Sequence, residues 1–134
     1  MLRDSLLIAI LLALPGCGKP EGWSEIGRVG AGVLYTDSST IATTGASATG
    51  WVMIDFSTPQ TTRGAVNGSQ HLSAKSQHEY DCAREQWRTL SIAYYSGHMG
   101  AGDMISATVG PSEWKPAIPG SSGKTLLDAA CGKS

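Results

Sequence analysis

The sequence predicts an α+β fold: an antiparallel β-sheet of about five to six strands, with a short C-terminal helix packed on it and one disulfide. Three observations support this prediction. Short segments alternate apolar and polar residues and are separated by turn residues, apolar residues near the C-terminus follow helical spacing, and Cys82 and Cys131 are available to pair. Alternation at a period of two indicates strands, whereas a period near 3.6 indicates a helix.

The first predicted strands lie in the segment 32–44. Val33, Leu34 and Tyr35 predict a strand over 32–37, and Asp37-Ser38-Ser39 is typical of a turn. A second short strand is expected over 39–44, ended by Gly45. Glycines interrupt the apolar residues before position 32, so no strand is assigned there.

Residues 50–57 give the clearest strand in the chain. Its two faces are expected to carry different rows: Val52, Ile54 and Phe56 on one, Trp51, Met53 and Asp55 on the other. A loop is expected over 59–69, where Asn67-Gly68 favours a tight turn.

Residues 71–82 alternate most regularly. One face holds Leu72, Ala74, Ser76, His78, Tyr80 and Cys82, and the other holds six polar residues: His71, Ser73, Lys75, Gln77, Glu79 and Asp81. This pattern predicts a half-buried antiparallel strand with one solvated face. Cys82 falls on the less polar face, as a buried half-cystine would.

The last part of the chain predicts a hairpin and then a helix. The hairpin joins a strand over 85–96, with Leu90, Ile92 and Tyr94 in one row, to a strand over 103–109 through a turn at 97–102. Ser121 or Ser122 is a suitable N-cap for the helix. Its apolar face is expected to hold Leu126, Leu127, Ala130 and Cys131.

The N-terminus predicts an exported lipoprotein. Leu6 to Leu14 form an apolar run with the length of a signal-peptide centre, too short to span a bilayer. Leu14-Pro15-Gly16-Cys17 resembles the bacterial lipobox, in which the cysteine receives a diacylglyceryl group. We therefore expect a signal peptide over 1–16, a lipidated tether over 17–22 and one domain over 23–134.

Other interpretations of this segment are an ordinary cleaved signal followed by a chance cysteine, or a buried N-terminal helix. The second is disfavoured because Gly18, Lys19 and Pro20 follow without further periodicity. Gly18 after the cysteine, in place of Asp, implies sorting to the outer membrane in a double-membraned cell.

The three cysteines divide into Cys17, assigned to the lipid, and Cys82 with Cys131. In an exported protein a leftover pair is best interpreted as a disulfide. The alternative is a cysteine-based metal site, which would need more ligands at closer spacing.

Composition and motifs argue against catalysis and nucleic-acid binding. The net charge is −1, and no run of Lys and Arg occurs. Gly120-Ser121-Ser122-Gly123-Lys124-Thr125 lacks the first glycine of a phosphate loop, and Ser121 with Lys124 has the spacing of an acylating pair but no companion motif. We therefore expect a plain helix N-terminus there, and no cofactor.

The histidines give no metal-site pattern. His71 and His78 are separated by an odd number of residues, so one strand would direct them to opposite faces. With His98 they are expected to be scattered, solvated or hydrogen-bonded side chains, and no metal site is predicted.

The order of these features resembles the surface-adhesin protein E family of proteobacterial lipoproteins. The matching pieces are Leu14–Cys17, Val33–Tyr35, Trp51–Asp55, Ser76-x-x-x-Tyr80-Asp81-Cys82, Arg88-x-Leu90-Ser91, Tyr94–Gly97, Gly100-x-Gly102, Trp114-x-Pro116-x-Ile118-Pro119-Gly120-Ser121, and Leu126-Leu127 before Cys131. The resemblance implies an antiparallel sheet with a C-terminal helix, a Cys82–Cys131 disulfide and surface display. It assigns no binding residues.

The function expected from these observations is a non-catalytic, envelope-anchored module for binding or adhesion, with extracellular or envelope proteins as partners. The polar face that carries Lys75, Gln77, Glu79 and Asp81 is a candidate docking surface, as is an exposed edge strand. The alternative is a periplasm-facing structural or accessory lipoprotein. A small hydrolase is the third hypothesis, and the linear sequence shows no Ser, His and Asp set to support it.

Overall fold

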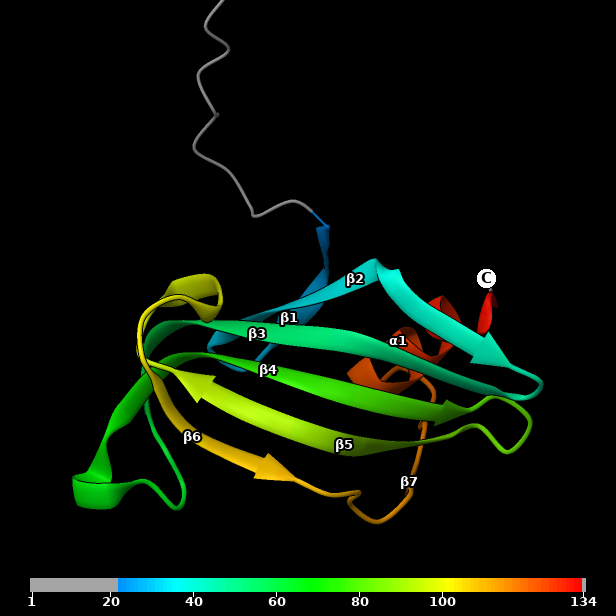
Figure 1. Ribbon diagram of the computed structural model, residues 1–134. Coiled ribbons are helices and arrows are strands. Elements are labelled where there is room, and N and C mark those ends of the chain that lie inside the picture. The colour runs from blue at the N-terminus through cyan, green and yellow to red at the C-terminus, as the bar shows by residue number, and fades with distance from the viewer. Residues whose placement is uncertain (1–21, 134) are drawn as a thin grey trace, which may run out of the picture.

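The computed structural model describes residues 22–133 of the chain (Figure 1). The predicted signal peptide, Cys17 and most of the expected tether lie outside the described residues. Seven strands form one antiparallel sheet, in the order β1-β2-β3-β4-β5-β6, with β7 pairing with β5. The strands are β1 Trp23–Val29, β2 Gly32–Thr44, β3 Ser47–Thr61, β4 Gln70–Asp81, β5 Gln86–Tyr95, β6 Met104–Val109 and β7 Lys115–Pro116. Two short 3₁₀ turns, η1 Val66–Gly68 and η2 His98–Gly100, and one helix, α1 Ser122–Cys131, complete the fold.

The predicted antiparallel sheet and C-terminal helix are confirmed. From β1 to β6 the order of strands in space is the order in the chain, so each strand is joined directly to its neighbour in the sheet. The β5–β6 hairpin forms as expected, and the backbone N–H of Ser96 donates to Asp103 across its end. At the predicted Asn67-Gly68 turn both residues have φ of 62°, a left-handed conformation that Asn and Gly tolerate.

The turn predicted at residues 37–39 is wrong, because β2 continues through it as one strand with a bulge. The register passes from Asp37 opposite Trp51 to Ala42 opposite Thr49, so extra residues are accommodated on β2. Side chains replace the missing ladder bonds. Asp37 Oδ1 accepts from the Ser39 N–H at 3.0 Å, and Thr40 Oγ1 accepts from the Trp51 N–H at 3.1 Å.

Two strands were not predicted. β1 forms despite its glycine, with a register shift between Glu25 and Gly27, and pairs with β2 at the edge of the sheet. β7 is only two residues long and pairs with Gln86 and Trp87 of β5. Neither segment shows enough alternation to be recognised without its partner strand.

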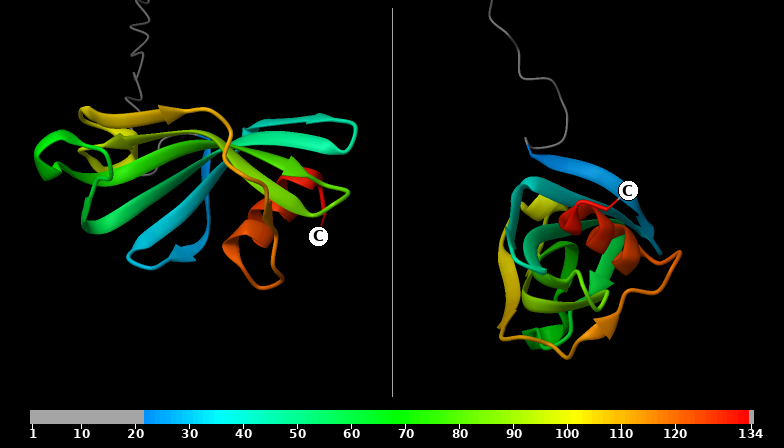
Figure 2. Two further views of the ribbon diagram at one scale, coloured as in Figure 1. Left: turned by 90° about the horizontal axis from the view of Figure 1, so that it is seen from below. Right: turned by 90° about the vertical axis from the view of Figure 1, so that its right-hand side faces the viewer.

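The sheet has an inner face, against which α1 packs, and an outer face on the opposite side (Figure 2). Val52, Tyr80 and Leu127 are at most 2% exposed at the centre of the core between the sheet and α1. Ser121 is the N-cap, its Oγ accepting from the Lys124 N–H at 3.2 Å, and Gly132 ends the helix at φ 70°. Leu126, Leu127 and Ala130 are buried as predicted.

A bulge in β5 decides which side chains of that strand face the helix. Ser91 pairs with Gln77 and Thr89 pairs with His78, so Leu90 has no partner on β4. The expected row of Leu90, Ile92 and Tyr94 is therefore broken. Trp87 and Thr89 line the inner face together with Ile92.

The outer face of β4 is less solvated than predicted. Ser73 is fully buried there, although it belongs to the row expected to face water. His71 of the same predicted row is 5% exposed for another reason: it lies beyond a register shift between β3 and β4 and packs against the rings of Phe56 and Tyr94. Lys75, Gln77, Glu79 and Asp81 are half-buried. The sequence pattern could not show that the segment 97–102 would fold back over one end of this face.

Candidate functional site

The candidate site is the outer row, which we define as Lys75, Gln77, Glu79 and Asp81 on the outer face of β4. This row is the docking surface expected from the sequence. One of its ends is covered by η2, and the other end, at Glu79 and Asp81, is open. The two ends therefore present different chemistry.

The covered end is held by hydrogen bonds from the backbone of η2. Asp55 Oδ1 accepts from the Met99 N–H at 2.8 Å and lies 3.1 Å from His98 Nδ1. Ser73 Oγ accepts from the Gly100 N–H at 2.8 Å and donates to the Gly97 carbonyl at 2.6 Å. The buried Ser73 hydroxyl and the Asp55 carboxylate therefore hold the loop in place, which explains why two polar side chains occupy this face.

Lys75 lies where η2 meets the outer row. Its Nζ is 5.4 Å from the centre of the Tyr95 ring, within cation–π distance. Gly100, at φ 75°, packs directly on the Lys75 side chain, where a Cβ would contact the lysine Cε. The contacts with Tyr95 and Gly100 thus hold the Lys75 side chain against the protein surface.

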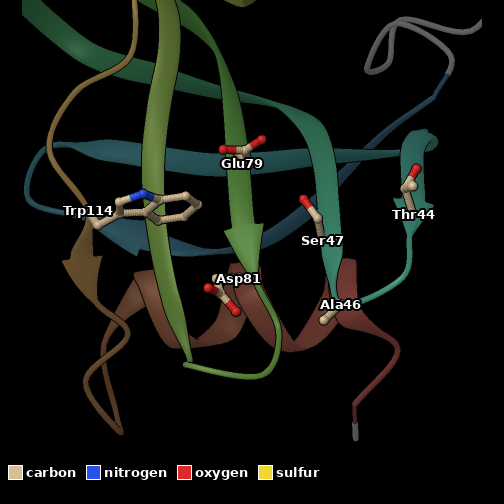
Figure 3. A pocket seen from close by; sticks show the side chains of 6 residues that line it. All are labelled: Thr44, Ala46, Ser47, Glu79, Asp81 and Trp114. Carbon is tan, nitrogen blue, oxygen red and sulfur yellow. The ribbon is translucent and has the colours of Figure 1, made fainter.

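The open end contains a shallow pocket of about 270 Å³ (Figure 3). It lies on the side of the strands away from α1, between the β2–β3 turn, the end of β4 and the segment before β7. The lining residues are Thr44, Ala46, Ser47, Glu79, Asp81 and Trp114.

Glu79 belongs to a stacked group on one wall of this pocket. Arg88 Nε donates to Glu79 Oε1 at 2.7 Å, across the β4–β5 pair. The guanidinium carbon of Arg88 lies 4.4 Å from the centre of the Trp114 ring. The planar guanidinium thus bridges a carboxylate and an aromatic face, an arrangement that arginine favours over lysine.

Asp81 supplies the second carboxylate of the pocket. Its Oδ1 accepts from the Arg84 N–H at 3.0 Å in the turn after β4. Arg88 compensates the charge of Glu79, so the side chains that line the pocket leave it negative and next to an indole ring. Carboxylates and aromatic faces both bind cations, and the pocket is therefore suited to a lysine or arginine side chain.

The three histidines lie in separate places. His71 Nδ1 is 2.7 Å from Thr62 Oγ1, and burial lowers the pKa of His71. His98 lies beside Asp55, and His78 is on the inner face. Within residues 22–133, no three His, Cys, Asp or Glu side chains gather closely enough to hold a metal ion.

His78 is the most perturbed of these groups. Burial lowers its pKa to about 4, and the positive charge of Lys115 acts in the same direction. Its Nε2 lies 3.0 Å from Ser76 Oγ, and its ring stacks on Trp87 with centroids 5.1 Å apart. His78 is therefore a neutral, hydrogen-bonded side chain at neutral pH.

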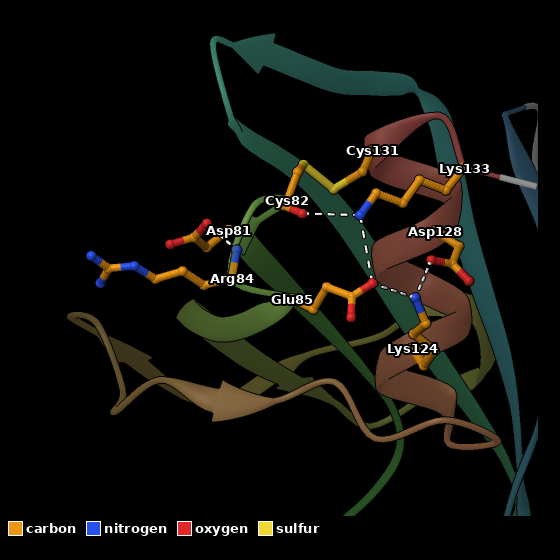
Figure 4. The surroundings of a disulfide bond; sticks show 8 residues. All are labelled: Asp81, Cys82, Arg84, Glu85, Lys124, Asp128, Cys131 and Lys133. Carbon is orange, nitrogen blue, oxygen red and sulfur yellow. Dashed lines mark hydrogen bonds and ion pairs between the residues drawn. A yellow bond between two sulfur atoms is a disulfide. The ribbon is translucent and has the colours of Figure 1, made fainter.

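A disulfide and ion pairs attach α1 to the β4–β5 turn (Figure 4). Cys82 and Cys131 are joined, with Cα atoms 5.8 Å apart. Lys124 Nζ lies 2.9 Å from Glu85 Oε1 and 2.8 Å from Asp128 Oδ1. Hydrogen bonds to Asp128 and Glu85 raise the pKa of Lys124, and the bond from Lys124 lowers the pKa of Glu85. The cysteines are thus crosslinked to each other, which leaves the metal alternative without ligands.

The Ser121–Lys124 pair has a structural role. Ser121 caps the helix, and Lys124 is directed to Glu85 and Asp128. An acylating pair would require the lysine amine to face the serine hydroxyl. The arrangement fits the plain helix N-terminus expected from the sequence.

The sequence did not identify Trp114, Arg88 or the β2–β3 turn as parts of the site. Glu79 and Arg88 are nine residues apart, and only the β4–β5 register makes them neighbours. Trp114 reaches them because β7 pairs with β5 and brings the preceding segment alongside. Only a prediction of the β4–β5 register could have placed Arg88 beside Glu79.

The described chain is thus a single antiparallel sheet with one disulfide-linked helix on its inner face and a polar, partly open outer face. None of the helices in the described part has the length and apolar character needed to cross a membrane. The family model for surface-adhesin protein E matches residues 23–132. The chain belongs to this family, which places it among adhesin-like surface proteins.

Solved structures of Haemophilus influenzae protein E share the fold. Crystal form II has a TM-score of 0.68 at 12% sequence identity, covering 89% of this chain and 94% of that one. The protein from non-typeable Haemophilus influenzae has a TM-score of 0.61 at 14% identity, covering 87% and 78%. No curated protein sequence matches this chain. At these identities the likeness concerns the fold alone.

Proposed function

We propose that this chain is a non-catalytic, lipid-anchored binding module of the bacterial envelope, displayed at the cell surface, which contacts a protein partner through the open end of its outer row. The observation that carries the proposal is the pocket of Glu79, Asp81 and Trp114 on the sheet face opposite α1. Membership of the surface-adhesin protein E family supports surface display.

The geometry of the outer face favours docking over catalysis. Glu79 is engaged by Arg88, and Asp55 and His98 hold η2 in place. These carboxylates thus hold neighbouring parts of the surface together. A shallow pocket that accepts one side chain, surrounded by half-buried polar residues, is typical of the rim and anchor positions of a protein interface.

The proposed anchor is the lipid on Cys17, followed by a short tether. Two or three acyl chains bound at one residue would hold the domain stably, because each buried CH₂ contributes about 0.8 kcal/mol. A surface-displayed module needs only such an anchor to remain with the cell.

The experiment compares the full chain with its Cys17→Ser variant in intact cells of the bacterium that produces the protein. We expect the full chain to be degraded by added protease while the outer membrane is intact, and its N-terminal fragment to carry a diacylglyceryl mass on Cys17. The Cys17→Ser chain should lose that mass and leave the membrane fraction.

Two results separate the alternatives. Protection in intact cells with degradation after permeabilisation would contradict display and favour a periplasm-facing accessory lipoprotein. An unmodified thiol at position 17 would contradict the anchor. A periplasmic protein control must stay intact in the same cells.

A further inference from the structure

The helix is too short to cover the inner face of the sheet. Ten residues of α1 extend for about 15 Å, whereas the fifteen residues of β3 extend for about 50 Å. Beside the N-terminal end of α1, the inner face therefore contains a partly enclosed cavity of about 260 Å³. This cavity is separate from the outer-row pocket.

Most of the exposed wall of the cavity is apolar. β1 contributes Val29, β2 contributes Leu34, and β3 contributes Val52 and Ile54, while α1 contributes Leu126 from the opposite side. No side chain with a full charge lines it. The wall would therefore favour an uncharged, apolar occupant, because a charged one would be desolvated without a partner.

Trp87 forms a flat part of the wall and is held from three sides. It stacks on His78, it packs on Gly123 of α1, and Lys115 Nζ lies 5.1 Å from the centre of its ring. A Cβ on Gly123 would lie 2.5 Å from Trp87 Nε1, so only glycine allows this approach. Such packing makes the wall preformed, which reduces the ordering cost of binding.

Ser76 and His78 form a hydrogen-bonding pair in this wall, which also contains the hydroxyl residues Thr89 and Ser122. Ser76 Oγ lies 3.0 Å from His78 Nε2, and both residues line the cavity. If His78 Nε2 accepts from Ser76, the serine oxygen can still accept from a ligand. If Nε2 carries the proton, the serine hydroxyl is free to donate. A ligand hydroxyl satisfies either arrangement.

We propose that this cavity binds an uncharged molecule of about two fused rings that carries one hydroxyl group, with Ser76 as its hydrogen-bonding partner. The size follows from the volume, because an engineered apolar cavity of about 150 Å³ binds benzene. A cavity of about 260 Å³ has room for a second ring. The assignment is independent of the proposed adhesion function, since it uses the other face of the sheet.

The test uses the full chain with Cys17→Ser, so that no acyl group competes for apolar space, and 2-naphthol as the probe. Saturable shifts of amide resonances should centre on Ser76, His78 and Leu126. Ser76→Ala should weaken 2-naphthol binding about tenfold, the loss expected for one buried hydrogen bond, and leave naphthalene binding within twofold. Ser76→Thr keeps the hydroxyl and should bind 2-naphthol more tightly than Ser76→Ala.

Gln77→Ala is the matched control, because Gln77 is the next residue on β4 and faces the outer side. It should bind both probes like the parent chain, and thermal melting must show that every variant is folded. Absence of saturable shifts at the inner face, up to the solubility limit of 2-naphthol, would overturn the proposal. Equal weakening of both probes in Ser76→Ala would also overturn it, since Ser76 would then only support the fold.

Discussion

The two faces of the sheet are each covered at one place, by different means. On the inner face, α1 packs apolar side chains against Val52 and Tyr80 and is crosslinked through Cys131. On the outer face, η2 is held through hydrogen bonds from its backbone to Asp55 and Ser73. Apolar contact stabilises in proportion to buried area, whereas a hydrogen bond exchanged with water contributes about 1 kcal/mol.

This difference between the two covers indicates which face contributes most to stability and which face is available for binding. The inner cover is long-range and joins the C-terminus to strands of the first half of the domain, so its loss affects the whole fold. The outer cover also joins distant parts of the chain, but it depends on a few hydrogen bonds over a small area, and beyond it the outer row remains open to a partner. The chain can therefore vary its outer surface with little effect on folding.

The largest expected effect follows removal of the crosslink between α1 and β4. Cys131→Ser should lower the free energy of unfolding by about 4 kcal/mol, the chain-entropy value for a loop of this size. The cysteines are 49 residues apart in sequence. Chemical denaturation measures the difference in unfolding free energy between the parent chain and the variant. The parent chain in excess dithiothreitol is the control, and it should unfold at the same denaturant concentration as the variant. Equal midpoints with and without the disulfide would show that packing alone holds α1.

An intermediate effect is expected from acidification, and it comes from the inner face. The pKa of His78 is lowered to about 4 by burial, while in the unfolded chain it returns to about 6.5. Between these two pH values the unfolded chain binds more protons than the folded chain. The contribution of His78 to the free energy of unfolding is therefore complete above pH 6.5 and falls as the pH decreases toward 4. The loss is about 2–3 kcal/mol at pH 4 for His78.

Urea denaturation between pH 7 and pH 4 measures this loss, and His78→Gln should reduce its slope against pH. The pKa of His71 is lowered in the same direction, so His71→Gln is needed to separate the two contributions. A pH dependence unchanged in His78→Gln would show that His78 is not the responsible group.

The fold was largely predictable because its signals are local. Alternation over 71–82 and 50–57, the spacing of Leu126, Leu127 and Ala130, and the Asn67-Gly68 turn each depend on neighbours in sequence. The Cys82–Cys131 disulfide was predictable once Cys17 was assigned to another role. These features agree with one another, which is the usual property of a sequence that specifies one fold.

The site was less predictable because it depends on register. The β5 bulge at Leu90 turns Trp87 toward the inner face, and the β4–β5 register places Arg88 beside Glu79. The prediction that His71 and Ser73 face water is wrong. His71 lies beyond the β3–β4 register shift and packs against the rings of Phe56 and Tyr94. Ser73 faces the outer side as alternation requires, but η2 returns from a later part of the chain to cover it.

The smallest effect on stability is expected at the open end of the outer face. Asp81→Asn keeps the oxygen that accepts from the Arg84 N–H, so unfolding should change by less than about 0.5 kcal/mol, as for an ordinary surface substitution. The effect on cation binding should be larger. We expect N-acetyl-arginine amide to bind the pocket and shift the Trp114 indole resonance. Asp81→Asn should weaken this binding about threefold, within the range of an exposed ion pair. Asp103→Asn is the control, since it removes the same charge at an exposed residue that does not line the pocket. Equal weakening by both variants would indicate that net charge, and not the pocket, attracts the cation.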